Sequence, residues 1–273
     1  MELRLCIDCG RLSAPGQSRC ACCGGGIRID DARALIGREF GRYRLLDVIG
    51  AGGMGIVYLA EHVGLARRVA LKLLLPSLDE AEFLERFRRE ARLLATLEHR
   101  HIVDVLDFDV TPEGVPFYAM ERLRGCTLAR ALAALRRPLT LTEIAGVVGD
   151  IARALAHAHE HRVVHRDLKP DNIFLAVEDD AIVPKLLDFG IAKQLDQDER
   201  AGRLTSTGMV MGTPLYLTPE QLGGEEVGPA TDQYALALIV AECLLGRPLR
   251  QGQTVTQILH TAVQERSLEA LSN

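Results

Sequence analysis

The 273-residue sequence contains no tryptophan, no long hydrophobic run and no excess of positive charge. The absence of tryptophan excludes no class of fold. The longest strongly apolar run, residues 235–245, is too short to span a bilayer and contains Glu242, so no membrane-spanning segment is expected within the sequence. With 32 Lys and Arg against 37 Asp and Glu, the net charge of −5 gives no general reason to expect nucleic-acid binding.

The N-terminal residues, MELRLCIDCG, lack the apolar segment of a secretory signal peptide. The cytoplasm is therefore the expected compartment, although a membrane anchor beyond Asn273 stays open. Cysteines in this compartment stay reduced and serve better as metal ligands than as disulfides. The length suits one large domain, or a two-lobed domain with a small appendage.

The sequence changes from strand-rich to helix-rich along its length. Short β-branched runs around a glycine-rich turn predict strands, and later segments with apolar residues every three or four positions predict helices. The predicted strands cover residues 43–50, 56–63, 67–75 and 117–121, and the predicted helices cover residues 80–98, 142–161 and 232–245. Thr142 is the expected cap of the second helix, whose buried side would include Ile144, Ile151 and Leu155. This order of elements predicts an α+β fold.

The segment HRDLKPDN, residues 165–172, places an acid, a base and an amide at a spacing that suits phosphoryl transfer. Asp167 can orient a hydroxyl group and accept its proton. Lys169 offers a positive charge to the phosphate in transfer, and Asn172 offers a neutral oxygen to a metal ion. Together with the sequence DFG at 188–190, this segment resembles the protein kinase family, and Lys169 is typical of the Ser/Thr branch.

Residues 49–60, IGAGGMGIVYLA, contain Gly50, Gly52 and Gly55 in a GxGxxG pattern. The same letters occur in dinucleotide-binding folds, which continue into a helix, and in ordinary hairpins. Here the glycines are followed by Ile-Val-Tyr-Leu, which favours a strand. A dinucleotide enzyme would also need an acidic contact to the ribose, which the sequence does not suggest.

Lys72 ends the apolar sequence VALK, 17 residues after Gly55. A buried lysine needs an anionic partner. The kinase resemblance implies that Lys72 holds the α- and β-phosphates of ATP and pairs with a Glu on the following helix. Glu90 matches that position, and the alternative is that Glu90 belongs to an ordinary solvated charge face.

The resemblance also implies an adenine pocket, although each of its residues is equally compatible with a core or connecting role. Its expected members are Ile49, Val57, Ala70 and Met120, with backbone hydrogen bonds from the segment Glu121–Leu123.

Asp188 is implied to bind Mg²⁺, or Mn²⁺ in its place, with Asn172 as the second protein ligand, since hard oxygen ligands suit these ions. Catalysis would then depend on positioning and charge neutralisation. A lone Asp more often caps a helix or a turn. Asp167 and Asp188, 21 positions apart in two motifs and in the expected order, weigh against that simpler role.

Regulation is implied by the segment that follows DFG. In the family, an Arg before the catalytic Asp, here Arg166, binds a phosphate on this segment together with a second basic residue, here Lys193. Thr205 and Thr207 match threonines that bacterial members autophosphorylate, with self-association as the expected route, and the alternative is a flexible loop rich in Ser and Thr. Thr213 matches the position that contacts the catalytic Asp and helps select Ser/Thr acceptors.

Two kinds of potential metal ligand occur elsewhere. His157, His159 and His161 alternate along a predicted helix, so the three cannot converge on one metal ion. The kinase resemblance implies a packing role for His159 and a structural role for His165. Near the N-terminus, two CxxCG sequences, with ten residues between Cys9 and Cys20, resemble a zinc ribbon. Its expected ligands are Cys6, Cys9, Cys20 and Cys23, with Cys22 as a bystander or alternate ligand. Unpaired reduced cysteines and a redox-switching pair remain alternatives, and docking of a protein is the expected role of the ribbon.

These patterns predict a two-lobed protein Ser/Thr kinase of bacterial type that uses ATP and Mg²⁺ on protein substrates. The expected parts are a zinc-binding segment at 1–26, a linker at 27–42 and a kinase domain at 43–273, with an N-lobe at about 43–121 and a C-lobe at about 126–273. The C-lobe is expected to be incomplete, because the family's last helices and the Arg that pairs with the Glu matched by Glu220 would follow Asn273. The rival from another class is a pseudokinase scaffold that binds partners, against which stand all four of Lys72, Asp167, Asn172 and Asp188.

Overall fold

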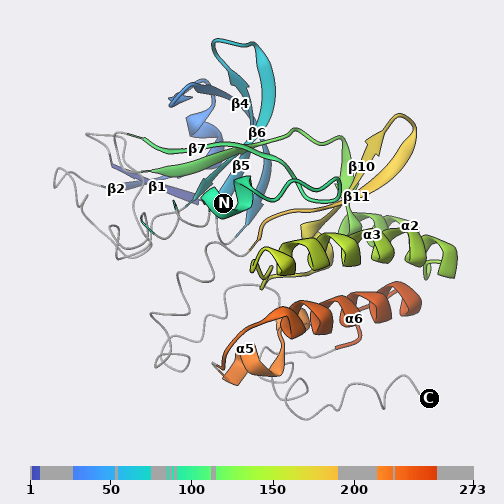
Figure 1. The fold of residues 1–273 in the computed structure, drawn as a ribbon. Coiled ribbons are helices and arrows are strands. Elements are labelled where there is room, and N and C mark those ends of the chain that lie inside the picture. The colour runs from blue at the N-terminus through green and yellow to red at the C-terminus, as the bar shows by residue number, and fades with distance from the viewer. Residues whose placement is uncertain are drawn as a thin grey trace. The chain divides into compact units, whose positions relative to one another are not determined.

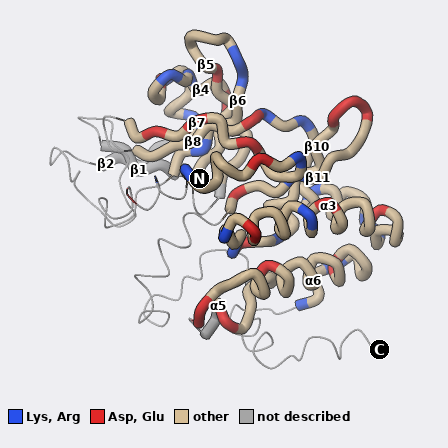
Figure 2. The backbone as a smooth tube through the Cα atoms, in the orientation of Figure 1, with Lys and Arg blue, Asp and Glu red and all other residues tan. Residues whose placement is uncertain are grey.

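The computed structural model describes residues 2–6, 27–52, 55–74, 85, 88, 91–111, 115–189, 214–223 and 225–250. The chain forms two compact units. Unit 1 consists of Met1–Thr96 and Asp104–Leu123, and unit 2 consists of Leu97–Val103 and Arg124–Asn273. Figure 1 labels their elements, and Figure 2 shows that basic and acidic positions are interspersed along both units.

Unit 1 contains a six-stranded antiparallel sheet in the order β3-β4-β5-β6-β8-β7. Its strands are β3 (Glu39–Phe40), β4 (Tyr43–Gly52), β5 (Gly55–His62), β6 (Arg67–Leu74), β7 (Val105–Val110) and β8 (Pro116–Met120). Alternate residues of β5, Ile56, Tyr58 and Ala60, are buried in the core of the unit, as a strand with one covered face requires. These strands confirm the strand-rich part of the α+β prediction.

The six residues at the end of β6, Val69 to Leu74, are all buried. This strand lies in the interior of the sheet, between β5 and β8. Lys72 is thus placed in a continuous apolar strand, as its sequence indicates. Of the helix predicted at 80–98, the structure assigns helical conformation to Glu85, Arg88 and residues 91–95, and Ala91 and Leu94 are buried as predicted.

The segment 27–42, expected to be a linker, instead contains regular structure. It forms β2 (Ile27–Asp31), the 3₁₀ helix η1 (Ala32–Leu35) and β3. Ala32 and Leu35 are buried in the core of unit 1. The hydroxyl of Tyr58 donates a hydrogen bond to the Ala32 carbonyl at 2.7 Å. Apolar burial and this bond anchor residues 32–35 to the sheet.

Unit 2 is built around helices and one small antiparallel sheet. Its elements are β9 (Gly125–Thr127), α2 (Leu128–Leu135), α3 (Leu141–Glu160), the 3₁₀ helix η2 (Pro170–Asn172), β10 (Ile173–Glu178), β11 (Ala181–Leu186), the 3₁₀ helix η3 (Pro214–Tyr216), α5 (Pro219–Gly223) and α6 (Pro229–Leu245). The strands pair in the order β11-β10-β9. Helix α6 contains the predicted 232–245 helix and begins three residues earlier, with a proline in its first turn.

The predicted cap of helix α3 was wrong by two residues. Thr140, not Thr142, is the cap: its side chain accepts a hydrogen bond from the Glu143 amide, and the Glu143 carboxylate accepts one from the Thr140 amide. This reciprocal pair needs Glu or Gln three positions after the cap, and the third residue after Thr142 is Ala145. The buried side of the helix is as predicted for Ile144, Ile151 and Leu155.

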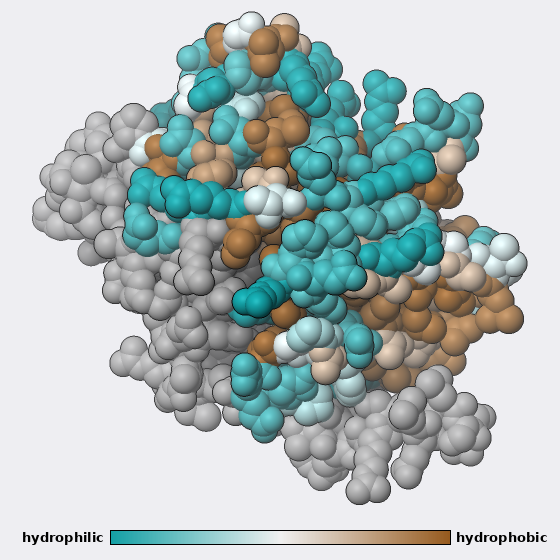
Figure 3. Space-filling model, in the orientation of Figure 1, coloured by the Kyte–Doolittle hydropathy of each residue, from teal (hydrophilic) through white to brown (hydrophobic). Residues whose placement is uncertain are grey.

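Exposed leucines gather where α2, α3 and α6 meet their connecting loops. They are Leu135, Leu141, Leu244 and Leu245. Figure 3 shows brown, apolar side chains over this part of unit 2. Within the described residues, no helix is both long and apolar enough to cross a membrane.

Candidate active site

In unit 1, the glycine-rich sequence forms the hairpin between β4 and β5. Gly52 pairs with Gly55 at its closed end, and β5 continues directly from Gly55 as a strand. Gly55 has φ +157°, and a Cβ atom there would lie 2.2 Å from the Leu73 carbonyl oxygen, so only glycine fits without a shift. A strand at this position excludes the helix that a dinucleotide-binding fold requires, so that alternative is rejected.

The residues expected to hold the nucleotide share one face of this sheet. Val57 is opposite Lys72, and Ala70 is opposite Met120. Because directly paired residues and residues two apart on a strand point to the same side, Val57, Lys72, Ala70 and Met120 lie on one face. The opposite face, which includes Leu71, belongs to the core of unit 1.

Lys72 is 8% exposed, and its Nζ lies 5.8 Å from the centroid of the Tyr118 ring. Ile49, by contrast, is 53% exposed on β4. After β8, the Glu121 amide donates to the Asp104 carbonyl at 3.0 Å, so this N–H is not available to a nucleotide. The backbone hydrogen bonds expected from the segment Glu121–Leu123 would therefore have to come from its other backbone groups.

In unit 2, η2 and the loop before it bring three predicted catalytic residues together. Lys169 Nζ lies 2.8 Å from Asp167 Oδ2. Asn172 Nδ2 donates to the Asp167 carbonyl at 2.8 Å and to Asp167 Oδ2 at 3.2 Å. A cation and an amide therefore both contact the carboxylate of Asp167, the expected base, at the spacing that the sequence indicated.

Asp232, in the first turn of α6, forms hydrogen bonds that hold this loop in place. The residue is 1% exposed. Its carboxylate accepts hydrogen bonds from the His165 amide at 2.8 Å and the Arg166 amide at 2.9 Å, and it contacts His159 Nε2 at 2.8 Å. Arg166 has φ +63°, a left-handed conformation that is unfavourable for a residue with a Cβ atom. The buried carboxylate keeps the loop in this conformation, directly before Asp167.

The segment after β11 places Asp188 beside the same loop. The Leu187 amide donates to the Asn172 carbonyl at 2.8 Å, and the Leu187 carbonyl contacts His165 Nε2 at 2.8 Å. Phe189 is buried with its ring centroid 4.8 Å from that of His165. Asp188 lies between these anchored neighbours with φ +46°. The sequence prediction of structural roles for His159 and His165 agrees with these contacts.

A second segment, residues 214–223, also contacts the loop that contains Asp167. Gln221 Nε2 donates to the Arg166 carbonyl at 2.7 Å. Leu217 and Tyr216 line a small cavity together with Asp167 and Lys169. The cavity thus lies next to the carboxylate that could accept a proton.

Two acidic residues support this segment. Glu220 was expected to lack its family partner, but Thr231 Oγ1 donates to its carboxylate at 2.7 Å. Burial opposes ionisation of Glu220, yet its hydrogen bonds, led by that of Thr231, hold its pKa below the ordinary value. The Tyr216 hydroxyl donates to Glu242, and the pKa of Glu242 is raised chiefly by burial.

Several predicted residues lie outside the described part of the chain. They are Glu90, Lys193, Thr205, Thr207, Thr213, Cys9, Cys20, Cys22 and Cys23. Cys6 ends strand β1 (Glu2–Cys6), which pairs antiparallel with β2 so that Cys6 is opposite Ile27. Among the residues that the structure describes, no group of three or more His, Cys, Asp or Glu could hold a metal ion.

Sequence reasoning missed Asp232 and Gln221 as parts of the site. Their partners, His165 and Arg166, lie 55 to 67 positions away in the sequence, so no local pattern joins them. Asp232 alone gave no signal of this role, because an Asp in the first turn of a helix is common and stabilises the positive end of the helix dipole.

Comparison with known proteins gives a consistent result. A family model described as protein kinase domain matches residues 43–272. The chain is 42% identical over 215 residues to serine/threonine-protein kinase Pkn1 of Myxococcus xanthus, which covers 78% of this chain and 30% of that protein. It is 40% identical over 232 residues to PknD of Mycobacterium tuberculosis, covering 85% of this chain and 34% of that protein. The chain thus spans about a third of the length of these curated relatives.

Among solved structures, the PknI kinase domain of M. tuberculosis is similar, with a TM-score of 0.63 at 31% identity. The alignment covers 79% of this chain and 77% of that domain. The similarity extends beyond local motifs to the fold.

Proposed function

The chain belongs to the protein kinase family, and from this premise we propose that it is a protein Ser/Thr kinase, which transfers the γ-phosphoryl group of ATP to hydroxyl groups of Ser and Thr in protein substrates. The observation that carries the proposal is the cluster in which Lys169 and Asn172 both contact the carboxylate of Asp167. Such a cluster combines a proton acceptor, a phosphate-binding cation and a metal ligand.

In the proposed reaction, Asp167 orients the acceptor hydroxyl and takes its proton as the oxygen attacks the γ-phosphorus. The bond from that phosphorus to the bridging oxygen of ADP breaks. Lys169, 2.8 Å from the carboxylate, stabilises the charge on the transferring group. No covalent bond to the protein is needed, because positioning and charge neutralisation suffice.

Asn172 and Asp188 are the proposed ligands of Mg²⁺. The amide nitrogen of Asn172 donates to two oxygens of Asp167, and this assignment leaves the amide oxygen as the group for a cation. When bound, Mg²⁺ would neutralise charge on the β- and γ-phosphates. On unit 1, Lys72 is proposed to bind the α- and β-phosphates, with Glu90 as its partner, and the face that carries Val57, Ala70 and Met120 to cover the adenine.

We further propose control by phosphorylation of the segment after DFG. Arg166 supports this idea, because its Nε is buried and has no hydrogen-bond partner among the described residues. A phosphate on Thr205 or Thr207, bound by Arg166 and Lys193, would order the segment that leads to Thr213. Phosphopeptide mapping of active protein should find phosphate between residues 204 and 213, and its absence there would remove this mechanism.

An N-terminal zinc ribbon is also proposed, with Cys6, Cys9, Cys20 and Cys23 as ligands. The register of β1 and β2 supports it, since Cys6 is opposite Ile27 and the two ends of the intervening segment are held together. Two CxxC sequences supply the four thiolates that a tetrahedral zinc site uses. The proposed role of the ribbon is the docking of a protein partner.

The decisive experiment is incorporation of radioactive phosphate from ATP into the protein and into Ser/Thr peptides. The wild-type protein should incorporate label. The rate of incorporation by the Asp167→Asn variant should be lower by at least about 100-fold, because the proton acceptor is gone. Equal thermal stability of the two proteins would show that the variant is folded. Nucleotide binding without any transfer by the wild type would favour the pseudokinase scaffold instead.

A further inference from the structure

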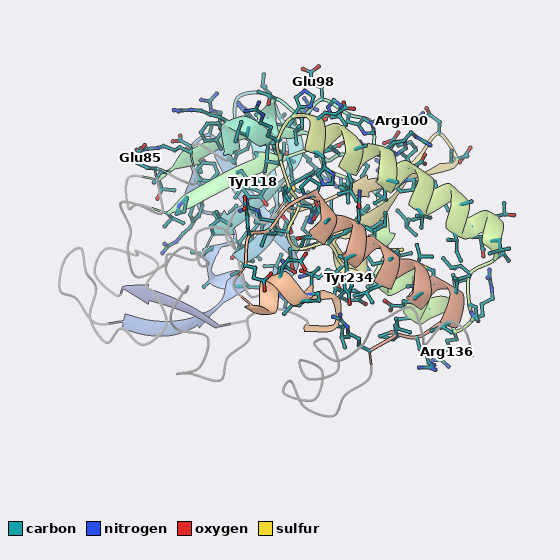
Figure 4. All side chains as sticks on the ribbon, turned by 60° about the horizontal axis from the view of Figure 1, so that its bottom comes forward. Glu85, Glu98, Arg100, Tyr118, Arg136 and Tyr234 are labelled. Carbon is teal, nitrogen blue, oxygen red and sulfur yellow. The ribbon has the colours of Figure 1, made fainter. Side chains whose placement is uncertain are left out.

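Arg250 is a fully buried arginine that the mechanism does not use. Its side chain is 1% exposed, five residues after the end of α6. Its Nη1 donates to the carbonyl oxygens of Leu217 at 2.5 Å and Leu215 at 3.3 Å, and its Nη2 donates to the hydroxyl of Tyr234 at 2.7 Å. The guanidinium also lies 5.5 Å from the centroid of the Tyr234 ring. Tyr234, labelled in Figure 4, belongs to α6.

A buried guanidinium costs free energy unless its surroundings compensate for lost water. The described partners of Arg250 are carbonyl oxygens, a phenol and an aromatic face, and its Nε has no hydrogen-bond partner among the described residues. An apolar side chain of similar size would fill the same space without that cost. The contacts therefore indicate a specific task, which is to hold the backbone of residues 215–217.

The backbone that Arg250 holds lies beside the reacting group. Leu217 lines the small cavity that Asp167 and Lys169 also line. Four residues further on, Gln221 donates to the carbonyl of Arg166, next to Asp167. The segment is thus tied to the catalytic loop at one end and to Arg250 in its middle.

We propose that Arg250 is a positioning residue for the protein acceptor: it fixes residues 214–218 so that Leu217 presents a rigid wall to the polypeptide that carries the reacting Ser or Thr. This inference rests on the proposed kinase function and adds a determinant of acceptor binding to it. Arg250 itself touches no reacting atom, so its effect should appear in acceptor affinity more than in nucleotide affinity.

The first test measures steady-state phosphorylation of a Ser/Thr peptide. The peptide is selected from a positional library as one that the wild-type protein phosphorylates. Arg250→Met should raise the KM for peptide about tenfold, because two charge-assisted hydrogen bonds to the wall are lost, and should change the KM for ATP less than about twofold. Arg250→Lys, which keeps the charge but not the fork of donors, should give an intermediate peptide KM. Arg247→Met, an exposed arginine three positions earlier, is the matched control and should retain wild-type values.

The second test does not depend on activity. The Thr218 amide donates to Gln221 Oε1 at 3.1 Å, so its hydrogen exchange reports whether the segment is ordered. Exchange in peptides covering residues 214–223 should be faster in Arg250→Met than in the wild type, with partial restoration in Arg250→Lys. Exchange in α3 should be unchanged. If the Met variant does not unfold cooperatively, the Lys variant is used for both tests.

Faster exchange together with a raised peptide KM supports the proposal. A wild-type peptide KM in a folded Arg250 variant overturns it, whether or not exchange has changed. A wild-type protein that transfers no phosphate, while the Arg250 variant still shows faster exchange, refutes the kinase proposal and the acceptor role together and leaves Arg250 as an anchor of the loop. An unchanged exchange rate with a raised peptide KM overturns the positioning mechanism but not the kinase function.

Discussion

At the scale of single residues, the site depends on two unfavourable backbone conformations. Arg166 and Asp188 have φ +63° and +46°, and each such residue costs about 1–3 kcal/mol. Both persist because their surroundings are fixed: Asp232 accepts hydrogen bonds from the backbone amides of His165 and Arg166, and Leu187 is hydrogen-bonded to Asn172 and His165. The strain is therefore located where functional side chains must be aimed.

Asp232 provides the sharpest residue-scale prediction. Asp232→Asn replaces a charged double acceptor with a group that has one acceptor oxygen and places an NH₂ against amide donors. We expect unfolding free energy to fall by at least about 2 kcal/mol, measured by urea denaturation, because hydrogen bonds to a buried charge are lost. The rate of phosphoryl transfer should fall as well.

The matched control is Asp180→Asn. Asp180 is exposed in the turn between β10 and β11 with φ +65°, a conformation that Asn tolerates well. This variant should unfold within about 0.5 kcal/mol of the wild type. Similar losses in both variants would show that Asp232 has no special role in holding the loop.

The sequence could predict the site residues that occur in contiguous motifs. Asp167, Lys169 and Asn172 lie within eight consecutive residues, so their grouping follows from local chain geometry. The grouping of Asp232 with His165 depends on how α6 packs, and Arg250 meets Leu217 only after a turn that follows the same helix. Contacts of this kind depend on tertiary packing, which one sequence does not reveal.

At the scale of elements, helix α3 allows a test of two neighbouring threonines. Hydrogen bonds from Arg137, then from Thr140, lower the pKa of Glu143 to about 2, so the capping carboxylate stays ionised across the neutral range. Thr140→Ala removes the cap and should reduce unfolding free energy by about 1 kcal/mol in urea denaturation. Thr142→Ala, two residues into the same exposed turn, should have almost no effect. A larger effect of Thr142→Ala would restore our original assignment of the cap.

Elements were predicted well where one period dominates. The strand at 67–75 follows from a continuous apolar run, and the helix ending near residue 161 follows from helical spacing. The segment 27–42 was expected to be a linker because its charges are mixed. Its order comes from Ala32 and Leu35 packing into the core of unit 1, and a short element of this kind has too few residues to show a period.

At the scale of the molecule, a group of histidines in unit 2 makes stability depend on pH. Burial, followed by the charges of His157, His101 and Arg153, lowers the pKa of His99 below its ordinary value of 6.5, while Asp150 opposes the shift. The folded protein therefore binds this proton less readily than the unfolded chain. The contribution of neutral His99 to folding stability is complete above about pH 6.5, where the unfolded chain is also neutral at this residue. It is lost as the pH falls through the lower pKa that His99 has in the folded protein.

The measurement is the thermal midpoint of the wild type at pH 7.5 and at pH 5.5. His99→Asn keeps an acceptor near the position of Nδ1, which binds the His101 amide at 3.2 Å, but cannot take up a proton. We expect a smaller loss of stability on acidification in this variant. His62→Asn removes an imidazole that also accepts backbone amides, but in unit 1, and serves as the control. An undiminished acid response in His99→Asn would assign the effect to other groups.

The last prediction concerns the N-terminal cysteines and whether the stability of their segment is independent of the stability of unit 2. A segment of about 20 residues cannot bury enough apolar surface to fold alone, so its order would have to come from a bound metal. Protein purified under reducing conditions should contain one zinc ion per chain by metal analysis. The variants Cys9→Ser and Cys20→Ser should lose this zinc. The control variant Cys126→Ser, at a free cysteine of unit 2, should retain it. Removing the zinc with a chelator should expose residues 7–26 to protease. It should leave the unfolding of unit 2 unchanged, because the described caps and side-chain hydrogen bonds of α3 and α6 are all made with residues of unit 2. Metal-free wild-type protein with a protected N-terminal segment would contradict the zinc ribbon and favour reduced cysteines in a segment ordered by other contacts.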